Sequence, residues 1–273
     1  MKFVFSRNRA CQLDALLSSL KENWRCSDPA LERLVVTWRA DSDAMIRAYT
    51  ICAFEHPEVV FQWRCDLRLE TLAAITADDL TCFFCDDAIL YQPVSDEVTE
   101  WIRRDPALIS FSARLGLNTL YCHPMDRWQS PPRDITVEAE TISWDWRNAE
   151  GDFGYALSID AHVMRSADLS RIVGDAAFGN PNHFEDALAA GRVVLAKDRP
   201  RLASYSSSRY VNIPSNRVNE THPNRTGTLH AYSPDELNER YLAGERIDWQ
   251  AMDYSGVNAA HCELPYVFKR KEN

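Results

Sequence analysis

The first 90 residues alternate short apolar runs with stretches in which apolar residues repeat at helical spacing. The apolar runs predict four strands, over residues 2–5, 34–38, 59–63 and 80–84. The stretches between them predict helices over residues 9–23, 42–55 and 66–75. Strands and helices that alternate in this way are typical of a parallel sheet covered by helices. The sequence therefore predicts an α/β fold with a Rossmann-related, mostly parallel sheet and helices on both faces.

The pattern is less regular after residue 90, so we expect an irregular C-terminal part. Further helices are predicted over residues 97–104, 168–172, 184–190 and 234–242, and a strand over 108–112. Ser233 followed by Pro234 is a typical start for the last of these helices. Polar segments at 121–134 and 204–227 predict loops, and a loop as long as the second is often functional. We expect one domain over residues 1–273.

Composition and charge narrow the function classes. The chain is 45 % hydrophobic, which is enough for one continuous core, and its net charge of −10 argues against nucleic-acid binding. The N-terminus lacks the apolar segment of a signal peptide, and no run approaches 18 apolar residues, so no membrane span is expected. The eight cysteines are scattered, and Cys82 and Cys85 should diverge because their spacing on a strand is odd. We therefore expect a cytoplasmic protein with free cysteines.

Two adjacent carboxylates give the sharpest chemical signal. Asp86 and Asp87 directly follow the fourth predicted strand, and in doubly wound sheets ligands bind beyond the carboxyl ends of the strands. Two such acids repel each other unless a cation or hydrogen-bond donors compensate them. A divalent ion that also touches phosphate oxygens is one solution, and Mg²⁺ or Mn²⁺ suits such hard ligands. The alternative is that both acids cap the turn that follows.

Charged residues also follow the other predicted strands. The turn Ser6-Arg7-Asn8-Arg9 lies between the first strand and a helix, where the positive end of the helix dipole favours phosphate or nucleobase contacts. It contains neither a Gly-x-Gly-x-x-Gly nor a Walker pattern, which argues against a dinucleotide site. Arg39 and Arg64 end neighbouring strands and could face a nucleotide or lie on the surface. Asp66 follows the third strand and could cap the helix that it precedes.

Together these motifs resemble glycosyltransferases of the GT-A type. The matching elements are residues 3–9, the helix start Gln12-Leu13, and residues 83–91, in which Cys85-Asp86-Asp87 stands for an Asp-x-Asp-like metal motif. The resemblance covers about the first 120 residues. It implies a GT-A-like fold whose nucleotide-binding half is 1–120 and whose acceptor-binding half is 121–273.

The resemblance also implies roles for individual residues. Those expected to contact the nucleotide are Ser6, Arg7, Arg9, Arg64, Asp66, Asp86 and Arg217. Asp87 would bind Mn²⁺ or Mg²⁺, although Cys85 stands where the metal motif has its first Asp. The segment 204–227 would form a lid, with His222 on the metal and Arg217 on the phosphates. Both residues could equally lie exposed in an ordinary loop.

The second half offers candidates for the acceptor side. Asp160 is the candidate general base for an acceptor hydroxyl, and Glu185 is the alternative carboxylate. Asp160 and His162 would share a face if both lay on one strand. Four aromatic residues could stack on a sugar ring or pack in the core: Trp144, Trp146, Phe153 and Tyr155.

Three functions remain open from the sequence. The first is a metal-dependent transferase that moves a sugar from a nucleotide donor, UDP-linked by the resemblance, to an unknown acceptor. The second is a binding protein for UDP or a nucleotide sugar that has lost turnover. The cysteine at position 85, where the metal motif has its first Asp, favours this function. The third is a nucleotidyltransferase or another phosphotransfer enzyme, and the missing Gly-rich, Lys-containing loop argues against it.

Overall fold

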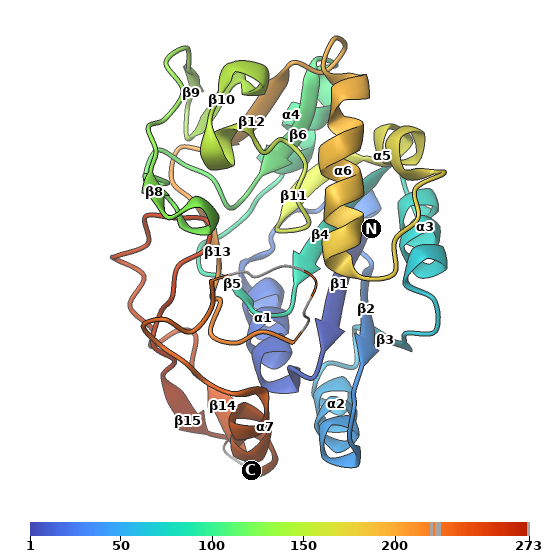
Figure 1. The fold of residues 1–273 in the computed structure, drawn as a ribbon, viewed down its shortest axis with the longest axis vertical. Coiled ribbons are helices and arrows are strands. Elements are labelled where there is room, and N and C mark those ends of the chain that lie inside the picture. The colour runs from blue at the N-terminus through green and yellow to red at the C-terminus, as the bar shows by residue number, and fades with distance from the viewer. Residues whose placement is uncertain (219–220, 222–224, 272–273) are drawn as a thin grey trace.

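The computed structural model describes residues 1–218, 221 and 225–271, which fold around one twisted sheet (Figure 1). In the described residues this sheet has nine strands, in the order β3-β2-β1-β4-β11-β6-β12-β10-β9. The four strands predicted in the first half are β1 (Lys2–Arg7), β2 (Leu34–Arg39), β3 (Val60–Trp63) and β4 (Leu80–Cys85). They pair in parallel, as predicted. The predicted helices between them are α1 (Ala10–Asn23), α2 (Asp43–Glu55) and α3 (Leu67–Ala77).

The second half adds strands of both directions, so the sheet is mostly but not wholly parallel. β11 (His162–Arg165) lies between β4 and β6 (Leu108–Ser112) and is antiparallel to both. Beyond them, β12 (Arg201–Tyr205) is parallel to β6, while β10 (Thr141–Asp145) and β9 (Thr136–Glu138) run antiparallel. The predicted strand 108–112 is therefore confirmed as β6. The pairing of β11 with β4 brings the loop that precedes β11, which contains Asp160, next to the end of β4.

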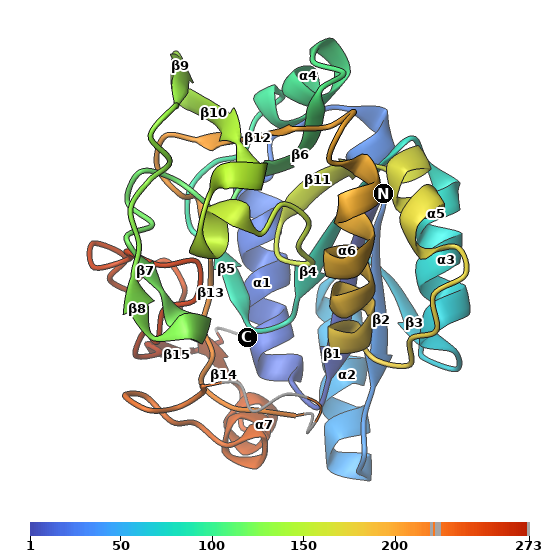
Figure 2. The same ribbon diagram turned by 45° about the horizontal axis from the view of Figure 1, so that its top comes forward.

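Helices cover both faces of the sheet because successive strand residues point to opposite sides. Val4 and Phe84 pack on the face covered by α1, α2 and α4 (Glu97–Arg104). Phe5 and Phe83 pack on the other face, against α3, α5 (Ser166–Val173) and α6 (Pro181–Leu195). Figures 1 and 2 show α1 and α6 on opposite sides of β1 and β4. The prediction of an α/β fold with helices on both faces is confirmed.

Two segments predicted as loops contain short strands. Residues 204–227 include the end of β12 and all of β13 (Tyr210–Asn212), which pairs with β5 (Ala88–Leu90). Periodicity missed β13 because it is three residues long, yet Tyr210 and Val211 are fully buried. Residues 121–134 include a small hairpin of β7 (Tyr121–Cys122) and β8 (Arg127–Trp128).

The C-terminal part packs beneath α1 and α2. It consists of α7 (Pro234–Leu242), which Ser233 caps as predicted, and the pair β14 (Glu245–Ile247) and β15 (Phe268–Arg270). Four single turns of 3₁₀ helix complete the described elements, at Pro29–Leu31, His123–Met125, Trp146–Asn148 and Gly151–Gly154. No helix in the described part of the chain is both long and apolar enough to span a bilayer.

Candidate active site

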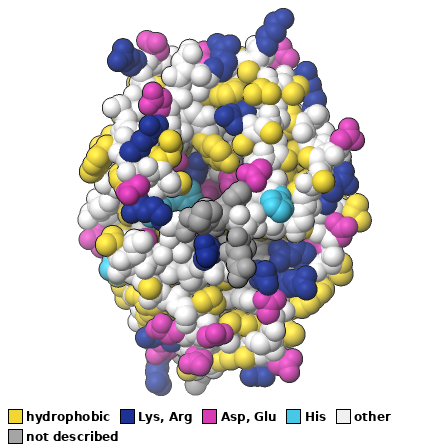
Figure 3. Space-filling model, viewed as in Figure 1, with side chains coloured by type: hydrophobic (Ala, Val, Ile, Leu, Met, Phe, Trp, Pro, Cys, Tyr) yellow, Lys and Arg dark blue, Asp and Glu magenta, His cyan; other side chains and the backbone are white. Residues whose placement is uncertain are grey.

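A cleft of about 520 Å³ opens at the carboxyl ends of β1 and β4. Figure 3 shows a hollow near the middle of this face, with acidic, basic and histidine side chains around it. Eight of the residues predicted for the site line the cleft: Ser6, Arg7, Arg9, Arg64, Asp86, Asp87, Asp160 and Arg217. They come from positions up to about 210 residues apart, and a cleft of this volume is typical of small-molecule sites.

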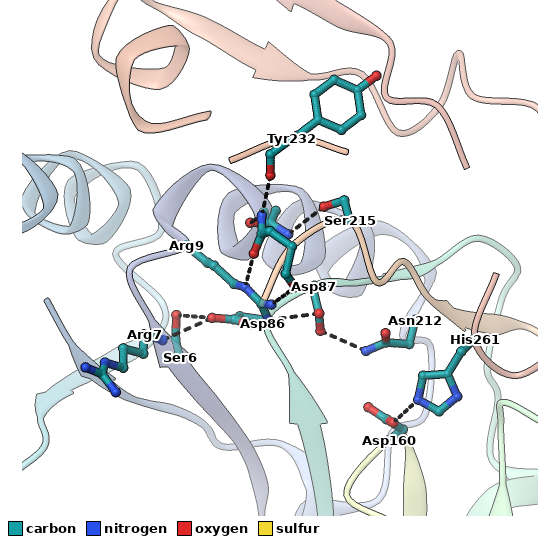
Figure 4. Close-up of polar contacts among 12 residues, drawn as sticks. Ser6, Arg7, Arg9, Asp86, Asp87, Asp160, Asn212, Ser215, Tyr232 and His261 are labelled. Carbon is teal, nitrogen blue, oxygen red and sulfur yellow. Dashed lines mark hydrogen bonds and ion pairs between the residues drawn. The ribbon is translucent and has the colours of Figure 1, made fainter. Parts of the chain in front are cut away.

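Asp86 and Asp87 share one cation, the guanidinium of Arg9 (Figure 4). Arg9 Nη1 lies 3.0 Å from Asp86 Oδ1 and 2.8 Å from Asp87 Oδ2. The other Asp86 oxygen accepts hydrogen bonds from Ser6 Oγ at 2.8 Å and from Arg7 N at 3.1 Å. The other Asp87 oxygen accepts one from Asn212 Nδ2 at 2.8 Å. All four carboxylate oxygens therefore have a protein donor, and we call Arg9, Asp86 and Asp87 the Arg9 cluster.

The far side of the Arg9 guanidinium holds the loop that follows β13. Arg9 Nε donates to Asn216 Oδ1 at 2.7 Å, and Arg9 Nη2 donates to the Asn216 carbonyl. Asn216 in turn donates to the Tyr232 carbonyl at 2.9 Å, which ties both ends of the loop together. Burial raises the pKa of Asp86 to about 6, with Arg9 opposing this shift and Asp87 adding to it. Arg9 thus links the acidic pair to the segment predicted to be a lid.

Three arginines stand side by side at the ends of β1, β2 and β3, and two of them, Arg7 and Arg64, line the cleft. Arg7 pairs with Arg39 in the parallel register of β1 and β2, and Arg64 follows β3 with its N–H bonded to the Trp38 carbonyl. Arg7 has an ion pair with Asp41 at 2.8 Å. Burial lowers the pKa of Arg64, and the charges of Arg7 and Arg39 lower it further. Like charges on adjacent strands repel each other, so this edge suits an anionic group.

Three further residues were predicted to bind the nucleotide or its metal, and their outcomes differ: Asp66, Arg217 and His222. Asp66 is exposed and caps α3, accepting a hydrogen bond from Leu69 N at 3.0 Å, which is the alternative that its position left open. Asp66 is not among the described residues that line the cleft. Arg217 lines the cleft, whereas His222 lies outside the described residues.

A second acidic group of the same cleft surrounds a buried arginine. We call Arg114, Asp152, Asp160, Glu185 and His261 the Arg114 cluster, all five of which line the cleft. Arg114 is 2 % exposed, but its contacts are long, 3.5 Å to Asp152 and 3.9 Å to Asp160. Its Nε and the Nδ1 of His261 are buried and have no protein hydrogen-bond partner within the described structure. Buried polar atoms of this kind are available to a ligand.

Two of the three carboxylates of the Arg114 cluster, Asp160 and Glu185, differ in proton affinity. Burial would raise the pKa of Asp160, but the hydrogen bond to His261 and the charges of His261 and Arg114 lower it to about 2. Burial and the charge of Asp160 raise the pKa of Glu185, and Arg114 opposes them. One Glu185 oxygen accepts hydrogen bonds from Ser158 Oγ at 3.0 Å and Ile159 N at 3.3 Å. Glu185 is therefore the better proton acceptor of the two.

Asp160 and His162 do not form a pair on one strand. Ala161 between them has a φ of 54°, and β11 begins only at His162. His162 is fully buried 3.3 Å from Ser110 Oγ, and burial followed by the charge of Arg114 lowers its pKa to about 3. The proton partner of Asp160 is instead His261, whose Nε2 lies 3.4 Å away (Figure 4).

Sequence patterns did not identify Arg114 or His261. Arg114 follows β6 by two residues, so the rule of charged residues after strands that selected Arg39 and Arg64 would have found it. His261 lies in an irregular stretch with no motif around it. Of the four aromatic candidates, Trp144, Trp146 and Phe153 are buried in the core, and Tyr155 lines the cleft.

A third group of ligating side chains lies outside the cleft. Asp14, Cys52 and His56 place one ligand atom each within 4.8 Å of the others, buried between α1 and α2. His56 Nε2 bonds Asp14 at 2.9 Å, and the guanidinium of Arg246 lies 3.9 Å from the same carboxylate. This group connects α1 and α2 to the C-terminal strands, and none of its three residues is among the described residues that line the cleft.

Comparisons with known proteins give similarities of fold. No known protein family matches the sequence, and neither does a curated protein. Among solved structures, TarS 1-349 of S. aureus is 14 % identical at a TM-score of 0.44, covering 77 % of this chain and 59 % of TarS 1-349. The structure of TarS 1-349 in complex with UDP-GlcNAc is 15 % identical at a TM-score of 0.43, and the match covers 88 % of this chain and 64 % of that one.

A mannosyltransferase from Pyrobaculum calidifontis, in complex with GDP-Man and Mn²⁺, is also similar. It is 14 % identical at a TM-score of 0.39, and the match covers 75 % of this chain and 56 % of that one. The chain thus spans less than two thirds of the length of these structures. At this level the likeness is one of fold and assigns no activity, so function has to be argued from the cleft itself.

Proposed function

We propose that this chain is a glycosyltransferase that takes a sugar from a nucleotide-diphosphate donor, UDP-linked by its sequence resemblance. The observation that carries the proposal is the single cleft that joins the Arg9 cluster to the Arg114 cluster. Transfer between two substrates requires one region that holds a charged donor and a neighbouring region that can accept a proton. The two clusters provide these two regions.

The donor would lie at the Arg9 end. Ser6 and Arg9 come from the turn before α1, a helix that has no side-chain cap and no acid in its first turn. The positive end of such a helix favours phosphate. Arg7, Arg64 and Arg217 line the same part of the chain's cleft and add positive charge for a diphosphate. Preorganised charges of this kind stabilise the charge that develops on a leaving diphosphate.

The acceptor would be activated at the Arg114 end. Its hydroxyl oxygen forms a bond to the anomeric carbon, the bond from that carbon to the diphosphate oxygen breaks, and the diphosphate keeps the electron pair. The hydroxyl proton passes to a carboxylate, and the raised pKa of Glu185 suits this role. Asp160, the base expected from the sequence, is held ionised by His261 and Arg114, which makes it the weaker acceptor of a proton. We assign Asp160 to the orientation of His261.

The resemblance also predicts Mn²⁺ or Mg²⁺ on Asp87, and the described residues do not fit a divalent ion there. Such an ion needs carboxylate oxygens that are open to it. The oxygens of Asp86 and Asp87 already accept hydrogen bonds from protein donors, and Arg9 lies within 3.0 Å of both acids. No step of the reaction above depends on a metal.

A binding protein without turnover is the second candidate function. The observation that favours it is the Arg9 cluster, which is satisfied by protein contacts alone, as in a site built to bind. Both functions require nucleotide binding, and they differ in whether the Arg114 cluster performs chemistry.

Two measurements test the proposal. Calorimetry with UDP, and with CDP and GDP as matched controls, should show binding that favours UDP. Incubation with UDP-sugars should then release UDP, by hydrolysis or by transfer to an added acceptor. If no nucleoside diphosphate binds, the proposal is wrong. If UDP binds while no UDP-sugar is consumed, the binding function replaces the transferase.

A further inference from the structure

Resting on the proposed function, we propose that Arg9 is the built-in cation of the Asp86–Asp87 pair and that the cleft binds a nucleoside diphosphate without a divalent metal. Adjacent carboxylates after a strand need positive charge between them. Here the charge belongs to the protein, because one guanidinium nitrogen lies 3.0 Å from Asp86 and 2.8 Å from Asp87.

Each oxygen of the two acids already accepts a hydrogen bond from the protein. Ser6 Oγ and the N–H of Arg7 occupy one oxygen of Asp86, and Asn212 Nδ2 occupies one oxygen of Asp87, while Arg9 takes the remaining oxygen of each. A metal that bridges the pair would have to enter where the guanidinium lies. Two cations cannot share that position without strong repulsion.

Arg9 is also held in place from its opposite side. Asn216 accepts two hydrogen bonds from Arg9, through its side chain and its backbone carbonyl. Arg9 is 9 % exposed, so removing it would break four hydrogen bonds, two to Asp86 and Asp87 and two to Asn216, and would leave a buried charge unpaired. A guanidinium remains charged at every pH at which proteins function, so the compensation is permanent.

The charge balance at this end suits a diphosphate without metal. Arg7, Arg64 and Arg217 line the cleft together with Arg9, which lies between Asp86 and Asp87, while Arg7 is paired with Asp41 at 2.8 Å. These arginines supply the positive sign that a diphosphate requires. Arginine binds phosphate oxygens in bidentate fashion, and does so without a bridging metal.

The direct test is calorimetry of UDP binding to the full chain in excess EDTA and in saturating Mn²⁺. We expect the two affinities to agree within about twofold, since one bound metal contact would change them by tenfold or more. UDP binding that is lost in EDTA would overturn the inference and leave the proposed function intact. An absence of UDP binding under both conditions would remove the proposed function instead.

A second measurement needs no variant and no nucleotide. Free Mn²⁺ gives an electron paramagnetic resonance signal that disappears when the ion is bound, so titration of the protein alone reports any metal site. We expect no stoichiometric loss of signal. Stoichiometric Mn²⁺ binding that Asp87→Asn removes would show that the metal enters the pair, and would contradict the role assigned to Arg9.

Variants of Arg9 separate charge from geometry. Arg9→Gln should weaken metal-free UDP binding by about tenfold or more, because it removes charge-assisted hydrogen bonds. The same variant should gain a dependence on Mn²⁺, since the freed carboxylates can then take the ion. Arg9→Lys, which keeps the charge, should remain independent of metal. The matched control is Arg171→Gln, which removes a surface arginine of α5 that pairs with Asp198, and it should bind UDP as the unaltered chain does.

Discussion

The Arg9 cluster and the Arg114 cluster are both groups of carboxylates around a buried arginine, yet they differ in how completely they are satisfied. Arg9 makes contacts of 2.8 and 3.0 Å with its two acids, and every carboxylate oxygen there has a donor. Arg114 lies 3.5 and 3.9 Å from Asp152 and Asp160, and two buried nitrogens of its cluster have no hydrogen-bond partner among the residues that the structure describes. A satisfied cluster holds its shape, whereas an unsatisfied one has contacts to offer a substrate.

The function we propose gives the two clusters different roles. In that proposal the Arg9 cluster presents fixed positive charge to the donor, and its acids position Arg9. The Arg114 cluster contains a carboxylate with a raised pKa, Glu185, beside one with a lowered pKa, Asp160. Neighbouring acids whose environments separate their pKa values are typical of catalytic pairs.

The largest effect should come from removing the proton acceptor. We expect Glu185→Gln to lower the rate of sugar transfer by about 10²–10⁴-fold, since a general base contributes that much. UDP affinity should change much less than the rate, because Glu185 accepts its hydrogen bonds from Ser158 and Ile159 and not from the Arg9 cluster. Steady-state kinetics and calorimetry on the same preparation measure both quantities. An unchanged transfer rate would exclude Glu185 as the base.

The two buried arginines should differ in their effect on stability. Arg9→Met leaves two buried carboxylates without their cation, and we expect it to reduce the free energy of unfolding by about 3–5 kcal/mol. Arg114→Met should cost less than half as much, because its contacts are longer. Denaturant unfolding of both variants makes the comparison, and equal losses would show that the clusters are equally satisfied.

Asp160 should tune the pH dependence of transfer. Glu185 must be ionised to accept a proton, so the rate should fall as the pH falls through its raised pKa. The charge of Asp160 helps to raise that pKa, so Asp160→Asn should move the acidic limb of the pH–rate profile to lower pH. If Asp160→Asn instead abolishes transfer at every pH, Asp160 is the base, as the sequence suggested.

The smallest effect should be at the row of arginines. Arg39→Gln removes one of three adjacent positive charges and should raise the free energy of unfolding by about 0.2–1 kcal/mol, the usual scale of a cross-strand pair. The exposed Arg171→Gln is its control. A loss of stability in Arg39→Gln would show that protein contacts already offset the repulsion among the three arginines, so that no anionic ligand is needed there.

Sequence patterns predicted the first half of the fold well, because its buried strands read as continuous apolar runs. They placed Asp86 at a strand end and Ser6 and Arg9 in the facing turn. They could not predict that Arg9 balances the negative charge of the two acids. Arg9 lies 77 positions before Asp86 and 78 before Asp87, and no local pattern reports a contact over that separation. They also missed the antiparallel insertion of β11, which carries Asp160 to the cleft, because strand order is set by packing.

A crystal structure of the complex with UDP, grown with Mn²⁺ present, tests the central claim most directly. We expect the diphosphate beside the Ser6–Arg9 turn, Arg9 still between Asp86 and Asp87, and the Arg114 cluster free for an acceptor. A metal ion on the two aspartates with Arg9 displaced, or UDP bound at the Arg114 cluster, would contradict the account.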